Sequence, residues 1–375
     1  MRQRSTIFTP GLTSGVVAAI AVAALWVTSP ARVSGQAQAP RPASPATTAK
    51  ASGFPRTPDG HPDFQGMYDI ATLTPVERPA GAPASITDEQ AAQREKAVAD
   101  RRARGTLPSR ADRQAPPLGG DGSTGAAGGV GGYNGFWIDA GSRYVEIDNQ
   151  KRTSIVVDPP DGHIPAPLPE AQQRNRRALT PTSDAAENSG AIGAGAFDNP
   201  EQRPLGERCI LGFGQTSGPP ALPDYFYNNL HQIVQTPTTV VILTEMIHDA
   251  RVVRMNEPHV PPGIRKWMGD SVGHWEGDAL VIDTTNFTDK TRFRGSSQDL
   301  HVVERISRLD EKNLLYRFTV DDPHTWAKPW TGEYNWPATN DQMYEYACHE
   351  GNYALGDILR GARVLEKEAA AQSKK

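Results

Sequence analysis

Polar and apolar positions alternate in short runs over residues 136–375, and turn residues separate the runs. In NLLYRFTVD (313–321), the alternation places Leu314, Tyr316, Phe318 and Val320 on one face, and Leu315, Arg317, Thr319 and Asp321 on the other. Because side chains alternate across a strand, this pattern predicts a strand with one buried face. Similar runs occur in SIVVDPPDG, HQIVQTPTTVVILTEM, ARVVRM, GDSVGHWEGDALVIDTTNF, HVVERISRLD and PWTGEYNWP.

Two of these segments have the form of a β-hairpin. The turn Glu276-Gly277-Asp278 separates two apolar runs, and a turn at residues 310–313 separates two more. Six to nine such strands in series describe an antiparallel meander. We therefore predict a mainly β fold that closes into an up-and-down barrel resembling lipocalins, because closure removes exposed edges. A β-sandwich is the alternative.

Helices are expected only at the two flanks of this β domain. Thr87 and Gln90 fit a capping box, and the polar run that follows predicts a helix ending before Gly105. It belongs to a region, 56–135, that also holds an extended segment and a Gly-rich loop. That loop lacks the GK[ST] of a phosphate-binding motif. A second helix is expected over 354–371, with Leu355, Ile358, Leu359 and Leu365 available to lie on the sheet.

The N-terminus is typical of an exported protein. Residues 1–36 combine Arg2 and Arg4 with the apolar run GVVAAIAVAALWV and small residues near Gly35, which predicts a cleaved Sec-type signal peptide. A membrane anchor is the alternative, but thirteen apolar residues are fewer than the roughly 20 that a spanning helix needs. Residues 37–55 have the Ala/Pro/Thr-rich composition of a disordered linker. We therefore expect a periplasmic or secreted protein without a transmembrane segment in the mature chain.

Composition and charge sharpen this picture. The 35 Gly and 32 Pro residues favour a turn-rich β protein over a helical bundle. Loss of a leader that holds three arginines and no acid shifts the formal charge from -4 to -7, which disfavours a nucleic-acid partner. Cys209 and Cys348 are the only cysteines, and in an exported chain an even count favours a disulfide. The alternative is a reactive or metal-binding thiol.

Ionisable groups on apolar faces are the candidates for acid/base chemistry. Glu304 falls between Val302 and Ile306 on one face of its strand, with His301 on the other face. Period-two counting also places Glu245 with Val241, Leu243 and Ile247, and His248 on the opposite face. The alternative is that these glutamates are structural, paired with cations or turned to water.

No metal or cofactor is predicted. His301 and Glu304 are three residues apart, so on a strand they point to opposite faces and cannot share an ion. A transition-metal site would need histidines of separate strands, for example His248, His301 and His349, and the spacing does not require one. Neither an HExxH zinc motif nor a GxSxG nucleophile elbow occurs in the chain.

Aromatic and basic residues provide candidates for substrate binding. Five of the seven tryptophans, including Trp275 and Trp330, lie within residues 267–336. They either line a pocket or fill the core. Arg294 lies in a polar loop (284–301) that could close a barrel mouth over an anionic group, or be a solvated hairpin loop.

Several long motifs resemble a large family of secreted bacterial proteins to which no activity is attached. They are RTPDGHPDFQG, ATLTPVERP, EMIHDARVV, IRKWMGDSVGHWEGDALVIDTTNFTDKTRFRGSS, LHVVER and YACHEGNY. The resemblance covers the chain from Arg56 to about Arg363. It implies export and a β-rich fold, and it transfers no catalytic residue.

Two functions remain open on the sequence. One is a periplasmic hydrolase, lyase or isomerase without a redox cofactor. In it Glu304, Glu245, His248 and His301 would be acid/base groups, Asp249 would orient a histidine, and Arg251, Arg294, Trp275, Trp330 and His349 would bind substrate. The other is a carrier that holds an apolar or sugar-like ligand in the same barrel. An envelope-interaction role is expected if no pocket exists, and the oligomeric state is not determined by the sequence.

Overall fold

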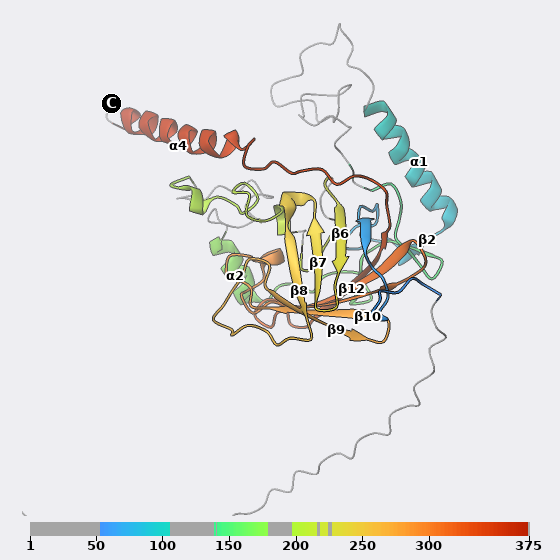
Figure 1. Cartoon of the computed structure of the whole chain (residues 1–375). Coiled ribbons are helices and arrows are strands. Elements are labelled where there is room, and N and C mark those ends of the chain that lie inside the picture. The colour runs from blue at the N-terminus through green and yellow to red at the C-terminus, as the bar shows by residue number, and fades with distance from the viewer. Residues whose placement is uncertain are drawn as a thin grey trace, which may run out of the picture. The chain divides into compact units, whose positions relative to one another are not determined.

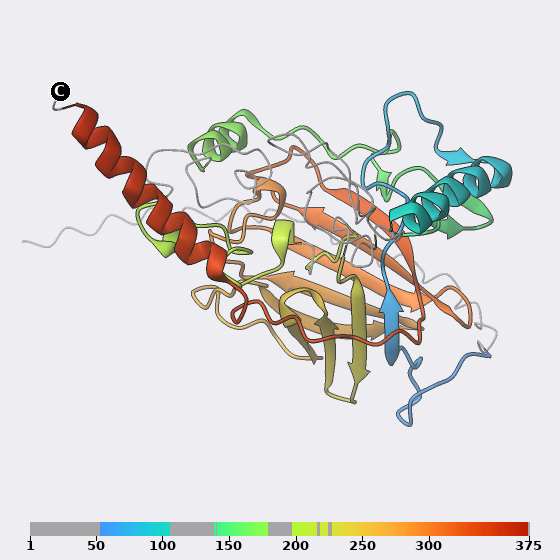
Figure 2. The same cartoon turned by 90° about the horizontal axis from the view of Figure 1, so that it is seen from above.

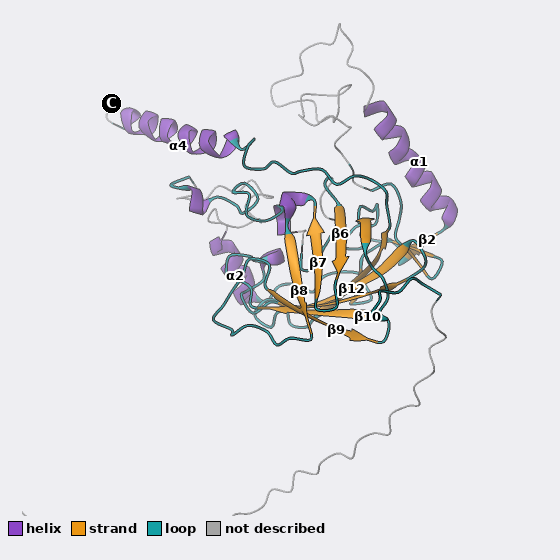
Figure 3. Ribbon diagram, in the orientation of Figure 1, coloured by secondary structure: helices purple, strands orange, loops and turns teal. Residues whose placement is uncertain are grey.

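The computed structural model describes residues 53–105, 139, 141–178, 197–215, 218–223 and 227–373. The predicted signal peptide, the Gly-rich loop and nearly all of the linker lie outside these ranges. The structure divides into the units Met1–Ser52 and Gly53–Lys375, and only the second is described below. Its architecture is mainly β (Figures 1 and 3).

One ten-stranded sheet dominates this unit. In spatial order its strands are β1 (Gly66–Asp69), β6 (Leu230–Gln235), β7 (Thr239–Thr244), β8 (Ala250–Met255), β9 (Asp270–Glu276), β10 (Ala279–Thr285), β11 (His301–Arg308), β12 (Asn313–Asp321), β13 (Trp330–Pro337) and β5 (Val156–Asp158). A small second sheet has the order β2 (Ser85–Ile86), β4 (Gln150–Arg152) and β3 (Glu146–Ile147). Every segment predicted as a strand in residues 136–375 contains one.

The predicted hairpins and alternation are confirmed. β9 pairs with β10 across Glu276-Gly277-Asp278, and β11 pairs with β12 across the turn at 309–312. Leu314, Tyr316, Phe318 and Val320 are all fully buried. We call the face that bears these residues the inner face of the sheet, and the opposite one the outer face.

The expected closed barrel does not form; the sheet is a curled half-barrel. β8 and β9 pair in parallel, which interrupts the meander and requires the crossover of residues 256–269. The opposite ends of the sheet approach each other at a single bridge, Tyr68 to Ala338, instead of a ladder. One bridge leaves β1 and β5 as edges, so the strands enclose no continuous barrel interior.

A segment of the chain covers the inner face of the sheet, where a barrel would leave room for a ligand. All five residues of Gly218–Leu222 are buried. The Ala221 N–H donates to the Tyr316 hydroxyl at 2.9 Å, and the Tyr334 hydroxyl donates to the Ala221 carbonyl at 2.9 Å. The core is therefore packed where a lipocalin would hold its ligand.

In the described ranges, three α-helices lie outside the sheet: α1 (Asp88–Gly105), α2 (Pro169–Ala178) and α4 (Tyr353–Gln372). The capping box of α1 is present, because Thr87 and Gln90 bond each other's backbone N–H. α4 has the expected bounds but projects from the sheet with no buried residue, and Leu365 is 67% exposed (Figure 1). The expectation that its leucines lie on the sheet is wrong.

A segment between β13 and α4, residues 338–348, runs across the ends of β6 and β7 (Figures 1 and 2). We call it the strap. Its first residues follow the β1 edge, where the Thr339 N–H donates to the Met67 carbonyl at 2.9 Å. Its last residue, Cys348, forms the predicted disulfide with Cys209. None of the helices in the described ranges is long and apolar enough to cross a membrane.

Candidate functional site

The predicted acid/base residues do not converge in one site. Glu304 is on the inner face, His301 is on the outer face, and Glu245 and His248 are in the turn between β7 and β8. Each therefore has a different environment.

Glu304 belongs to a buried ion pair. Both of its carboxylate oxygens bind the Arg251 guanidinium, with Nη2 to Oε1 at 2.8 Å, and the Tyr316 hydroxyl donates to Oε1 at 2.6 Å. Glu304 is 0% exposed and Arg251 is 4% exposed. Burial and then the neighbouring carboxylate raise the pKa of Tyr316 well above its usual value. Solvent does not reach this group, so the structural alternative for Glu304 holds, and Arg251 is not free to bind an anionic substrate.

The other predicted binding residues serve packing or lie at the surface. Trp330 is fully buried against Phe293 and Phe318. Trp275 stacks on His61 at 4.5 Å between ring centroids. Arg294 and His349 are exposed, outside the cavity described below. The polar loop 284–301 packs on the core through Phe293, so it closes no barrel mouth.

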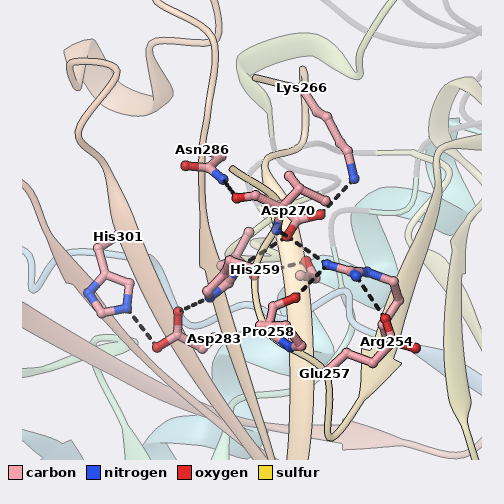
Figure 4. A network of polar contacts seen from close by, with 12 residues as sticks. Arg254, Glu257, Pro258, His259, Lys266, Asp270, Asp283, Asn286 and His301 are labelled. Carbon is pink, nitrogen blue, oxygen red and sulfur yellow. Dashed lines mark hydrogen bonds and ion pairs between the residues drawn. The ribbon is translucent and has the colours of Figure 1, made fainter. Parts of the chain in front are cut away.

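His301 lies at one end of a polar network on the outer face (Figure 4). Its Nε2 is 2.9 Å from Oδ2 of Asp283, whose Oδ1 is 3.0 Å from Nε2 of His259. The Nδ1 of His259 is in turn 3.2 Å from Oδ2 of Asp270. Since both ring nitrogens of His259 face carboxylate oxygens, only the imidazolium can donate to both.

Asp270 is the buried centre of this network and is 1% exposed. It accepts from Arg254 at 2.9 Å, from Lys266 at 2.6 Å and from the Val260 N–H at 3.0 Å. Burial alone would raise the pKa of Asp270, but these donors outweigh it and lower the pKa to about 2. The network therefore fastens the crossover 256–269 onto the sheet.

The His301–Asp283 contact predicts a pH dependence of stability. The hydrogen bond to Asp283 outweighs the burial of the ring and raises the pKa of His301. A raised folded-state pKa means that this stabilisation is complete below the unfolded value of about 6.5 and is lost as the pH rises through the folded-state value. We expect His301→Gln to lower the urea midpoint at pH 5.5 and to have little effect at pH 9. The exposed His349→Gln is the control, and an equal effect of His301→Gln at both pH values would contradict the assignment.

Glu245, His248 and Asp249 all bind backbone N–H groups of other segments. Oε1 of Glu245 accepts from Tyr344 at 2.9 Å, and Nε2 of His248 accepts from Tyr346 at 3.0 Å. Oδ2 of Asp249 accepts from Gly212 at 3.1 Å. Cys209 and Cys348 join the same two segments covalently. The turn and the disulfide together therefore hold the strap against the sheet.

The backbone of this turn explains why period-two counting failed at Glu245. β7 ends at Thr244, and Glu245 takes a helical conformation. Ile247 and His248 then have φ values of 59° and 54°. A β-branched residue rarely adopts that region, so surrounding contacts must hold the turn. As a result Glu245 belongs to no strand face and reaches the space under the strap.

That space is a cavity of about 620 Å³ between the ends of β1 and β6 and the strap. Its described lining residues are Asp69, Asp139, Asn228, Asn229, Leu230, Glu245, Asp341, Gln342, Tyr344, Glu345, Tyr346 and Ala347. Glu245 is the one predicted catalytic residue among them.

Asp69 is one of the carboxyl groups of the cavity that the sequence did not single out, and its pKa is strongly shifted. Burial, followed by the charge of Asp139, raises its pKa to about 7. Its Oδ1 accepts the Ala71 N–H at 2.9 Å, while Asp139 is paired with Arg102. The alternation Tyr68-Asp69-Ile70, with both flanking residues buried, marks Asp69 as facing away from the core, but no sequence signal brings it to Glu245.

The comparisons with known proteins give no identification: no family model, curated protein or solved structure matches the chain. Among the described residues, no three His, Cys, Asp or Glu side chains are grouped so as to hold a metal ion. The geometry of the cavity is therefore the basis on which a function can be assigned.

Proposed function

We propose that this protein is an exported enzyme that performs acid/base chemistry on a small polar molecule in the cavity under the strap, with Asp69 and Glu245 as its ionisable groups. The observation that supports it is the presence of these two carboxyl groups, from β1 and from the β7–β8 turn, in the lining of one cavity. Hydrolysis, elimination and isomerisation all use such a pair.

The two carboxyl groups are suited to different roles. With a pKa near 7, Asp69 is about half protonated at neutral pH, where it can donate a proton in the transition state. Glu245 is 6% exposed, and its Oε1 is held by the Tyr344 N–H. We assign Asp69 as the general acid and Glu245 as the group that accepts a proton or stabilises positive charge.

Export is supported by the disulfide and by the sequence of residues 1–36. The size of the cavity also suits a ligand-binding protein, since such pockets span roughly 300–1,000 Å³. A carrier is thus the second candidate. A carrier would release the bound molecule unchanged, whereas an enzyme would convert it.

We expect the purified protein to convert specific compounds when it is incubated with a small-molecule extract. Mass spectrometry of the extract measures their loss over time. Asp69→Asn and Glu245→Gln should each slow this turnover roughly 100-fold or more, since a positioned acid or base contributes about 10²–10⁴. The rate should fall as the pH rises above about 7, because Asp69 then loses its proton.

Asp161→Asn, an exposed aspartate outside the cavity, is the matched control. Full turnover by both cavity variants would refute the site assignment. If an intact molecule co-purifies with the protein and is never converted, the protein is a carrier and not an enzyme.

A further inference from the structure

The lining of the cavity is rich in acceptors and poor in cations. It contains five carboxyl groups, and its described residues include no lysine, arginine or histidine. Arg102 pairs with Asp139, and its charge also acts on Asp69, but no salt bridge of Glu245 or Glu345 is found among the described residues. The electrostatic potential in the cavity is therefore negative, and it favours a positively charged occupant.

Glu245 provides a second and more specific observation. It is more than nine-tenths buried, and its described contacts involve only Oε1, which accepts the Tyr344 N–H. Within the described part of the chain, Oε2 has no hydrogen-bond partner although it belongs to a residue that lines the cavity. Oε2 is not among the enclosed side-chain atoms without a partner, so it opens into the cavity, where a donor group of a ligand can reach it.

Two neighbouring polar groups present acceptors in the same cavity. Asp69 accepts a backbone N–H through Oδ1 alone. Asn229 uses its amide NH₂ on the Asp139 carbonyl at 2.8 Å, so its side-chain oxygen is left as an acceptor. A ligand that brings several N–H donors and a positive charge would complement all of these groups.

We propose that the cavity binds a small organic amine in its ammonium form, with the ammonium group donating to Glu245 and Asp69. This inference takes the cavity of the proposed function as its site and defines its substrate class. An ammonium has three donors and no acceptor, which matches a lining of carboxylate and amide oxygens. A neutral polyol would leave the negative field uncompensated, and an anion would be repelled.

Binding of an ammonium should release protons at neutral pH. A cation beside Asp69 favours the ionised carboxylate, so it lowers a pKa that burial and Asp139 hold at about 7. The carboxyl groups that are half protonated in the free protein then lose their protons. This coupling distinguishes an amine in the cavity from an amine that is bound elsewhere on an acidic surface.

The test is isothermal titration of the full mature chain at pH 7 with 1,4-diaminobutane and n-butylamine. The uncharged isosteres 1,4-butanediol and n-butanol, and the anion succinate, complete the panel. Each titration is repeated in two buffers of different ionisation enthalpy, which reports the protons released. We expect an amine to bind at least tenfold more tightly than its alcohol, with release of up to about half a proton per molecule at pH 7, because Asp69 is about half protonated in the free protein.

Variants locate the site. Glu245→Gln should weaken amine binding roughly tenfold or more, and Asp69→Asn should abolish proton release, while both variants keep the circular dichroism spectrum of the wild type. Glu311→Gln, an exposed glutamate in the β11–β12 turn, is the control and should change neither. The binding readout needs no turnover, so the amine proposal and the proposed enzyme function can fail separately.

Several outcomes would overturn the proposal. They are equal affinity for amine and alcohol, binding that survives both cavity substitutions, absence of binding by every amine, or displacement of the amine by calcium ion at a similar concentration. The last result would indicate an inorganic cation in the cavity.

Discussion

Glu304→Gln is expected to destabilise this protein by about 3–5 kcal/mol, because it leaves the Arg251 guanidinium buried without a counter-charge. Both side chains are almost completely excluded from solvent, and they meet through two parallel hydrogen bonds. The effect is measured as the free energy of unfolding in urea. It is a stability effect, so any turnover by the folded fraction should be retained.

Two further variants make this prediction specific. The double variant Arg251→Met/Glu304→Leu removes both charges and should regain much of the lost stability, since an apolar pair of similar volume often replaces a buried ion pair. Glu276→Gln breaks an exposed pair with Arg305, which water screens, and should have a much smaller effect on stability than Glu304→Gln. A Glu304→Gln protein as stable as the wild type would contradict the structural role. If Glu304→Gln does not fold, the stability of the double variant tests the prediction, which requires that removal of both charges restores folding.

Removal of the Cys209–Cys348 disulfide is the second change with a large expected effect. The bond closes a loop between residues 139 positions apart, and its loss should cost about 2–5 kcal/mol, mainly through the entropy of the unfolded chain in the loop-closure model. The double variant Cys209→Ser/Cys348→Ser should therefore unfold at a lower temperature and lower urea concentration. Dithiothreitol should produce the same shift in the wild type and none in the variant.

The disulfide should also affect the cavity, because it anchors the end of the strap. Near that end, the hydrogen bonds from the Tyr344 N–H to Glu245 and from the Tyr346 N–H to His248 also hold the strap. We expect hydrogen exchange of both amides to become faster in the double variant, while amides of β11 and β12 change only with global stability. Unchanged exchange at Tyr344 and Tyr346 would show that the strap stays in place without its covalent tether.

The sequence by itself determined the local structure. Short alternating or apolar runs located the strands of the large sheet in residues 136–375, but not β3 and β4 of the small sheet. Period-two counting also placed Leu314, Tyr316 and Glu304 on the buried face, because alternation across a strand needs only the chain itself. The sequence also predicted the capping box at Thr87 and the disulfide between the only two cysteines. For Glu304, the sequence left a catalytic and a structural role open, and the position of Arg251 decided between them.

Closure of the sheet depended on pairings that alternation does not encode. The crossover at 256–269 places β9 parallel to β8, and its attachment requires His259 to meet Asp270 of β9 and Asp283 of β10. Runs of apolar residues predict strands but not their order or direction. The barrel was therefore the simplest topology for the pattern, and the half-barrel is the one that the long-range contacts produce.

The candidate site was decided by the tertiary structure alone. Glu245 leaves its strand because Ile247 and His248 adopt a left-handed backbone, a conformation that only surrounding contacts make tolerable. Its partner Tyr344 is 99 residues away in the sequence, and Asp69 comes from the first strand. The sequence thus supplied the ionisable residues and the strands that support them. The fold determined which of them share a cavity, because burial, charge and donors there come from segments that are distant along the chain.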